Sequence, residues 1–318
     1  MNLTKESTKI EDGIPIYADD VYWGKLSKGE MEESLDVIDK KGWGAFDSKY
    51  GGKFDFTYEE DRADWHFNLN IDKNSKVLDI GAGMGRSTIP LARVAGEVFA
   101  FDMSIHRMRF LKRRIKQESL NNVTIFVGDI FDLPLPDGSF DVIAMNGILE
   151  WVGKTKRYEN PKTAQIEALK ICKKLLKKNG QLYVGIENRF ALAYLKGVDH
   201  SGLRFTSYMP KPLANVYMKL RKKERYDTYI YTKRGLEKLF VEAGFNDIET
   251  YLPYPGYNLP RILIPYDNIF ALRHVISKIM STNTFSKKFI KIFSYSNILL
   301  KIYRHFFFSF NVIAKNDD

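Results

Sequence analysis

The 318-residue chain has a formal net charge of +10, and 44% of its residues are hydrophobic while 28% are charged. That composition is typical of a soluble globular protein, and no run reaches the roughly 18 apolar residues that a membrane-spanning helix needs. Met1–Asp20 is too polar for a signal peptide, and Cys172 is the single cysteine, which excludes an internal disulfide. These observations predict a cytoplasmic protein.

The charge is unevenly distributed along the chain. Residues 1–75 hold 10 Lys/Arg and 17 Asp/Glu, whereas residues 188–318 hold 21 and 10. A basic surface can attract acidic partners such as nucleic acid, nucleotide-linked sugars or anionic lipid. Scattered lysines can equally form a solvated face, so both interpretations stay open.

The first 58 residues are assigned to an N-terminal extension. Met1–Asp20 is expected to be mobile, and Leu26–Lys40 is expected to form a helix. Glu59–Leu69 should form a further helix that leads into the first strand of the core.

A strand, a glycine-rich turn and a helix follow at residues 76–94. Lys76–Ile80 contains a short apolar run that favours a buried strand, and Ser87–Val94 has the pattern of a helix. Between them, glycine stands at every second position: Gly81, Gly83 and Gly85. Glycine permits unusual backbone angles and lets a ligand approach the backbone, while the helix directs free N–H groups at that ligand.

The details of this turn argue against a dinucleotide. The dinucleotide fingerprint needs a third glycine where this chain has Arg86, and the acid Asp79 is unfavourable next to a pyrophosphate. A nicotinamide-dependent dehydrogenase is therefore disfavoured.

Two more strands end in acidic residues. Glu97–Phe101 is followed by Asp102, which can accept hydrogen bonds from two ribose hydroxyls or can cap the helix Ser104–Gln117. Val123–Val127 is followed by Gly128, Asp129 and Ile130, and a turn at Pro136-Asp137-Gly138 precedes a fourth strand that ends near Met145.

In this order and spacing, the segments resemble the class I methyltransferases that depend on S-adenosylmethionine (SAM), most closely in the segment LPLPDGSFDVI. The resemblance implies SAM as the cofactor, with Asp102 on the ribose, Asp129 on the adenine amino group, and Ile130 and Met103 on the two ring faces. Arg62 is a candidate for the methionyl carboxylate, or it pairs with a neighbouring acid on the surface. The remaining residues expected at the cofactor are Asp79, Gly81, Ala82, Gly83, Gly85 and Asn146.

The predicted fold is α/β: a Rossmann-like, seven-stranded sheet with helices on both faces. The resemblance adds a last strand, antiparallel, between strands five and six. The expected segments after the extension are the core 59–187, a cap insertion 188–231, a helix and strand six 232–255, a basic and aromatic insertion 256–307, and the last strand and tail 308–318. Because both insertions leave the carboxyl ends of strands, we expect them to form a cap over the methyl donor.

Candidate catalytic residues follow strands four and five. Glu150 follows strand four, Glu187 and Asn188 end strand five, and His200 lies in the next loop. His200 is the preferred general base for a hydroxyl acceptor, because a positioned histidine can remove its proton. The alternatives are a loop histidine without catalytic function and a structural ion pair for Glu187. No metal ligands are expected.

The acceptor is predicted less directly. The residues Gly147-Ile148 argue against a nucleobase, since base methyltransferases carry two prolines after the residue that corresponds to Asn146. The stretch from Ile186 to Phe205, together with YLPYPGYNLP at 251–260, resembles methyltransferases found with glycosyltransferases in surface-polysaccharide biosynthesis. This resemblance implies a small or glycan-type acceptor methylated at oxygen. The alternatives are a lipid or RNA methyltransferase and a non-catalytic SAM-binding partner protein.

The insertion 256–307 has basic residues spaced among apolar ones. Such a segment can pack its apolar side on the core, lie peripherally on the inner face of a membrane, or hold nucleic acid. Packing is favoured, nucleic acid is disfavoured, and the oligomeric state is not predicted.

Overall fold

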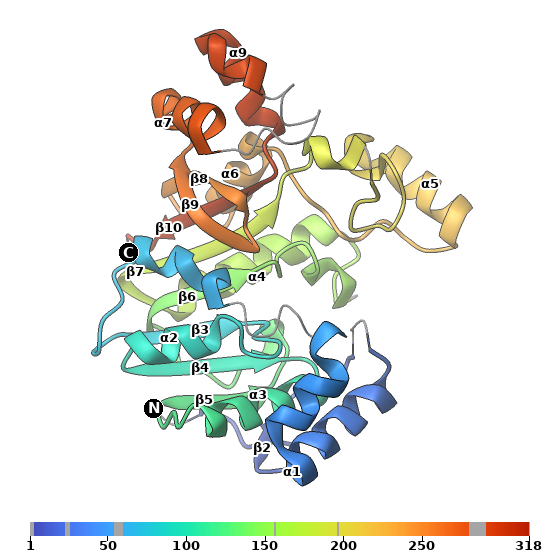
Figure 1. Cartoon of the computed structure of the whole chain (residues 1–318), viewed down its shortest axis with the longest axis vertical. Coiled ribbons are helices and arrows are strands. Elements are labelled where there is room, and N and C mark those ends of the chain that lie inside the picture. The colour runs from blue at the N-terminus through green and yellow to red at the C-terminus, as the bar shows by residue number, and fades with distance from the viewer. Residues whose placement is uncertain are drawn as a thin grey trace. The chain divides into compact units, whose positions relative to one another are not determined.

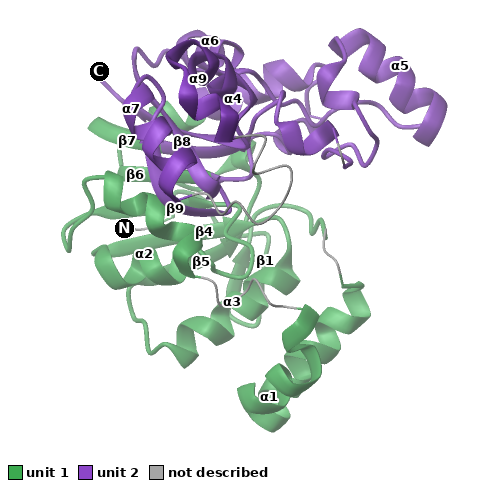
Figure 2. Cartoon of the chain, turned by 45° about the horizontal axis from the view of Figure 1, so that its top comes forward, with its two compact units in different colours: residues 1–145, 171–182, 318 green, residues 146–170, 183–317 purple. Residues whose placement is uncertain are grey.

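The computed structural model describes residues 3–22, 26–53, 60–155, 157–195, 197–279 and 291–317 (Figure 1). The chain divides into two compact units (Figure 2). Unit 1 consists of residues 1–145, 171–182 and 318, and unit 2 consists of residues 146–170 and 183–317.

Unit 1 is built on parallel strands joined by helices. Its strand order is β1-β2-β5-β4-β3-β6-β7, and β2, β5, β4, β3 and β6 pair in parallel. The bounds are β1 (Lys9–Glu11), β2 (Ile14–Ile16), β3 (Lys76–Ile80), β4 (Glu97–Asp102), β5 (Val123–Val127), β6 (Phe140–Asn146) and β7 (Leu176–Glu187). Because these parallel strands end at one edge, the residues after β3 and β4 come together there.

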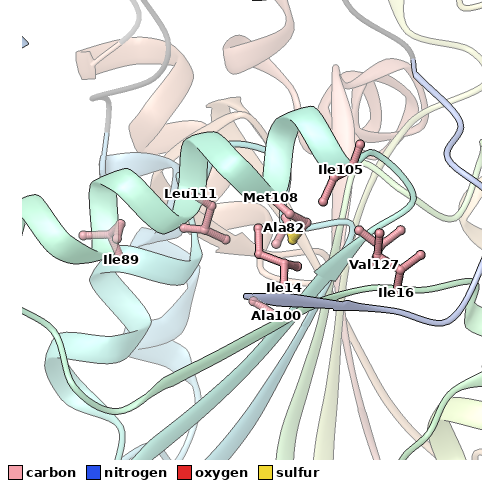
Figure 3. Packing of buried hydrophobic residues seen from close by; sticks show 9 residues of the cluster. All are labelled: Ile14, Ile16, Ala82, Ile89, Ala100, Ile105, Met108, Leu111 and Val127. Atoms are coloured by element: carbon pink, nitrogen blue, oxygen red, sulfur yellow. The ribbon is translucent and has the colours of Figure 1, made fainter. Parts of the chain in front are cut away.

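The N-terminal residues differ from the sequence expectation. Instead of a mobile segment, β1 and β2 form a hairpin, and Ile16 of β2 pairs with Val127 of β5. Ile14 is fully buried and Ile16 nearly so, against Ile105, Met108 and Leu111 of α3 (Figure 3). The two isoleucines alternate with Pro15, and their burial fixes this short strand on the sheet.

In the described part of unit 1, α2 (Thr88–Val94) and α3 (Ile105–Gln117) pack on these strands, and α1 (Lys28–Tyr50) packs on α3. Helix α1 begins at a capping box in which Ser27 and Glu30 satisfy each other's backbone N–H groups, and it kinks at Gly42. The basic residues of α3 pair with acids of the N-terminal extension. Arg113 binds Asp39, and Arg109 lies 2.8 Å from Asp12.

Unit 2 continues from the last part of β7. The order β7-β10-β8-β9 places β10 (Ser309–Lys315) between β7 and β8 (Asp247–Gly256), antiparallel to β8. This confirms the predicted place of the last strand. β9 (Leu259–Pro265) is an addition, since it forms a hairpin with β8 inside the segment expected to be an insertion. With β1, β2 and β9, the described residues hold ten strands rather than seven.

Among the described residues of unit 2, the α-helices are α4 (Pro161–Leu175, whose last residues belong to unit 1), α5 (Lys211–Lys222), α6 (Lys233–Glu242), α7 (Ile269–His274) and α9 (Asn297–Tyr303). Leu272 of α7 and Leu300 and Tyr303 of α9 are buried, so part of the segment 256–307 packs its apolar residues inside unit 2, and its packing on the methyltransferase core stays a prediction. The basic pair Lys287-Lys288, on which the membrane interpretation of this segment partly rested, lies outside the described residues. Across the described ranges, none of the helices combines the length and apolarity that crossing a bilayer requires.

Candidate active site

The glycine turn after β3 is shaped by all three glycines. Gly81, Gly83 and Gly85 have φ angles of +69°, +54° and +88°, a region that other residues rarely adopt. A Cβ atom on Gly83 would meet only the carbonyl oxygen of Gly81, at 4.0 Å, whereas a Cβ on Gly85 would lie 2.4 Å from Cδ1 of Leu111. Gly83 therefore leaves open space for a ligand, and Gly85 lets α3 pack closely.

Asp102 connects this turn to the end of β4. One oxygen of its carboxylate accepts a hydrogen bond from the N–H of Gly83 at 3.1 Å, and the other accepts one from the N–H of Ser104 at 3.0 Å. Arg107 lies 3.5 Å away and balances the charge. Ser104, and not Asp102, is the N-cap of α3. Each carboxylate oxygen can accept a further hydrogen bond, so the group fits a ribose diol.

Asp79 lies beneath the turn and is 2% exposed. The Thr88 hydroxyl donates a hydrogen bond to it at 2.6 Å. Burial raises the pKa of Asp79 to about 6, opposed by the Thr88 hydrogen bond and by the positive charge of Arg62. Arg62, in the 3-10 helix η2 (Glu60–Asn68), is thus electrostatically coupled to the turn, and its predicted contact with the methionyl carboxylate stays a prediction.

The other predicted cofactor residues lie near strand ends. Asp129 accepts a hydrogen bond from the N–H of Phe131 at 3.1 Å, and Ile130 is buried. Met103 is half-buried next to Asp102. Ala82 donates its N–H to the carbonyl of Phe101 at 2.9 Å.

Asn146 ends β6 at the start of unit 2. A Cβ on Gly185 would lie 2.2 Å from its Oδ1, so this close approach requires glycine at position 185 unless the Asn146 side chain shifts. That requirement was missed by sequence reasoning, because it arises from two strands that are distant in the chain.

Unit 2 brings three of the predicted catalytic residues together. Nε2 of His200 lies 3.1 Å from Oε2 of Glu187 and 3.4 Å from Oε1 of Glu150. The Glu150 side chain is fully buried, whereas those of Glu187 and His200 are 23% and 20% exposed. The ring of Trp151 lies 5.0 Å from the His200 ring. We call Glu150, Glu187 and His200 the acid–histidine cluster.

Burial and neighbouring charges shift the pKa values of Glu187 and His200 upward. Burial raises the pKa of Glu187 to about 7, and the charge of Glu150 adds to this while His200 opposes it. Burial alone would lower the pKa of His200, but its contact with Glu150 and the charge of Glu187 outweigh burial and raise that pKa. A group whose pKa lies close to the working pH is suited to proton transfer.

Two residues that sequence reasoning missed hold the cluster in place. The Asp199 carboxylate accepts hydrogen bonds from the N–H groups of Ser201 at 2.8 Å and Ser207 at 2.6 Å, which folds the loop that carries His200. Gln165 of α4 donates to the carbonyl of Leu149 at 2.9 Å, directly before Glu150. Both contacts join residues whose pairing has no local sequence signal.

Asn188 has a different environment from the one predicted. Its side chain is fully buried, donates to the carbonyls of His305 and Phe307 at 2.8 Å each, and accepts from the N–H of Phe190. These hydrogen bonds use its donors and its acceptor inside the protein. We therefore leave Asn188 out of the proposed catalytic set and assign it to holding the loop after β7.

Comparisons with known proteins agree with this arrangement. Residues 71–233 match the family described as "Methyltransferase domain", which is half of the chain. The demethylmenaquinone methyltransferase of Staphylococcus epidermidis is 30% identical over 191 residues, covering 57% of this chain and 71% of that protein. The chain therefore belongs to the methyltransferase family.

Two further similarities were found. The demethylmenaquinone methyltransferase of Staphylococcus haemolyticus is 28% identical over 193 residues, covering 57% of this chain and 73% of that protein. A structure of phosphoethanolamine N-methyltransferase 2 from Haemonchus contortus with SAM has a TM-score of 0.48 at 17% identity, over 92% of this chain and 60% of that one. The family assignment rests on the sequence comparisons.

The chain is thus a SAM-dependent methyltransferase, and SAM is its cofactor. The glycine turn and the Asp102 carboxylate fit this group, because the turn leaves open space at Gly83 and the carboxylate that suits a ribose diol lies next to it. The roles of the individual residues, and the predicted cap formed by the two insertions, stay predictions.

Proposed function

We propose that this enzyme methylates a hydroxyl group of a small or glycan-type acceptor. The observation that supports the proposal is the acid–histidine cluster, in which one imidazole lies within 3.4 Å of two carboxylates. SAM supplies an electrophilic methyl group on a sulfonium, so the protein has to orient the acceptor and remove its proton. A hydroxyl group needs such a base.

Exposure separates the roles within the cluster. His200 and Glu187 are partly exposed and can touch an acceptor, whereas Glu150 is completely buried and cannot. In the proposed step, His200 takes the hydroxyl proton, and Glu150 stabilises the imidazolium that results. Glu187 orients the hydroxyl by accepting a hydrogen bond. Asp199 and Gln165 act through the cluster as positioning residues.

A second acceptor class is favoured by the 30% identity to the demethylmenaquinone methyltransferase of S. epidermidis. We therefore propose a demethylmenaquinone-type acceptor as the second candidate for this chain. It is an acceptor of the lipid class, which the sequence leaves open as an alternative. The link to glycosyltransferases and polysaccharide biosynthesis, a cytoplasmic location, and membrane contact through residues 256–307 also stay predictions.

The test is a methyl-transfer assay with isotope-labelled SAM and a panel of nucleotide sugars, oligosaccharides, phenols and demethylmenaquinone, with the methylated atom identified by NMR. We expect a product methylated at oxygen, and a loss of kcat of about 10²–10⁴-fold in His200→Asn. The matched control is His274→Asn on α7, an exposed histidine outside the cluster, which should keep full activity.

A product methylated at carbon or nitrogen would overturn the proposed hydroxyl acceptor. Full activity of His200→Asn on a hydroxyl acceptor would overturn the role of the cluster while leaving the methyltransferase assignment intact.

A further inference from the structure

Helix α5 has two apolar faces, and only one of them packs on the protein. Ala214 and Met218 are buried against Tyr226. On another side of the helix, Leu213, Val216 and Leu220 are 60%, 54% and 77% exposed. Their spacing of three and four residues puts these three side chains in one stripe along the helix. We call them the α5 stripe.

Cations border the α5 stripe. The segment from Lys211 to Lys223 contains five Lys or Arg residues and no Asp or Glu. Two of the lysines are engaged inside unit 2. The ammonium of Lys211 lies 3.6 Å from the Tyr229 ring centroid, and that of Lys222 donates to the carbonyl of Ser201 at 2.6 Å.

The other three cations, Lys219, Arg221 and Lys223, are exposed, and no carboxylate among the described residues lies within ion-pair distance of them. At 100° per residue, Arg221 falls on one side of the stripe, and Lys219 and Lys223 fall on the other. The apolar stripe is therefore bordered on both sides by positive charge.

We propose that α5 is a membrane-contact helix that lies flat on an anionic lipid surface. A helix with exposed aliphatic residues, cations on both borders and no acid has the pattern of an interfacial helix. Its 12 residues span about 18 Å, which suits a helix in the plane of the surface and is far too short for one that crosses it. Figures 1 and 2 both show α5 projecting from the rest of unit 2.

Charge distinguishes a lipid surface from a protein partner. A helix that docks on another protein commonly carries both signs of charge around its apolar stripe, since acid–base pairs set the register. The borders of the α5 stripe carry one sign only, which complements anionic headgroups. The proposal does not depend on the identity of the methyl acceptor.

The test is co-sedimentation of the full chain with vesicles of roughly three parts phosphatidylcholine to one part phosphatidylglycerol, compared with phosphatidylcholine alone. We expect binding to the anionic vesicles that weakens at high salt, because screening removes the electrostatic part. The double variant Leu213→Ser with Leu220→Ser should bind at least about tenfold more weakly. Lys219→Gln with Arg221→Gln should lose the preference for anionic vesicles.

Matched controls are on α6, where Val241 is 55% exposed and Arg234 and Lys238 are exposed cations. Val241→Ser, and Arg234→Gln with Lys238→Gln, should bind vesicles like the wild type. The proposal is overturned if the wild type does not bind vesicles, or if the α5 and α6 variants bind equally. It is also overturned if, without vesicles, sedimentation velocity shows a dimer that the α5 leucine variants dissociate, since the stripe would then be an interface between two copies.

Discussion

At the scale of single residues, the three glycines of the turn after β3 serve different purposes. Gly83 faces open space, whereas Gly85 faces the buried side chain of Leu111. A side chain at a positive φ angle costs about 1–2 kcal/mol at either position. At Gly85 a side chain would also clash with Leu111 of helix α3, which adds to the cost of the backbone angle.

Gly83→Ala should therefore lower the free energy of unfolding by about 1–2 kcal/mol and weaken SAM binding. Gly85→Ala should lower it by about 2–4 kcal/mol, because the conflict with Leu111 adds overpacking. Urea denaturation of both variants measures this difference. Equal losses of stability would show that Leu111 moves aside without cost.

The acid–histidine cluster makes a prediction about pH. Glu150 raises the pKa of both His200 and Glu187. In Glu150→Gln this contribution disappears, so both pKa values fall, and the group that accepts the proton becomes deprotonated at lower pH. The acidic limb of the pH profile of kcat/KM should move to lower pH.

Profiles of the wild type, Glu150→Gln and the exposed control Glu242→Gln provide the comparison. An acidic limb that stays in place or moves to higher pH in Glu150→Gln would argue against proton transfer by the cluster. The direction of the shift is the same whether His200 or Glu187 is the base, and His200→Asn tells the two apart.

Some of the site could be read from the sequence because its parts are local. The glycine turn, Asp102 and Asp129 each follow a strand directly, so an apolar run and its end locate them. Asp199 and Gln165 could not be found in this way, since their partners are other loops. The hydrogen bonds of Asn188 inside the protein could not be predicted either, because sequence position alone does not show which direction a side chain takes from a strand end.

At the scale of elements, the hairpin of β1 and β2 shows how little sequence a strand needs. The segment is polar overall, and only Ile14 and Ile16 mark its inner face. Alternation over three residues is too short to separate a strand from a loop. The strand exists because an edge of the sheet and the side of α3 are there to receive both isoleucines.

This explanation predicts a contrast between two isoleucines of the hairpin. Ile14→Ala should destabilise the fold by about 2–4 kcal/mol, because Ile14 is fully buried. Ile10→Ala should change stability by less than about 0.5 kcal/mol, because Ile10 is 66% exposed. Thermal and urea unfolding measure both values, and similar effects would mean that the hairpin is not packed in solution.

The segment expected to be an insertion after strand six illustrates a different difficulty. Its first part, β9, pairs with β8 over Tyr251–Gly256. In β8 itself, Pro253 and Pro255 favour a loop over a strand in a sequence pattern. The hydrogen-bonded pairing of β8 with β9 outweighs the preference of these prolines for a loop.

At the scale of the whole chain, the uneven charge has two explanations. The acids of the N-terminal extension neutralise the basic helix α3, as the pairs of Asp39 with Arg113 and Asp12 with Arg109 show. The basic excess after residue 188 includes Lys219, Arg221 and Lys223 at α5, which form no ion pair among the described residues. Counting charged residues along the sequence shows where the basic and acidic residues are concentrated, but it does not show which of them form ion pairs.

We predict that unit 1 binds SAM through the glycine turn and Asp102. Calorimetric titration of SAM into the wild type, Asp102→Ala and the exposed control Asp247→Ala tests it most directly, with thermal melting to confirm that each variant is folded. The wild type and Asp247→Ala should bind SAM alike, and NAD should not bind. Asp102→Ala should bind SAM at least about tenfold more weakly, because charged hydrogen bonds contribute about 1.5–3 kcal/mol. Equal SAM affinity in a folded Asp102→Ala would contradict the claim.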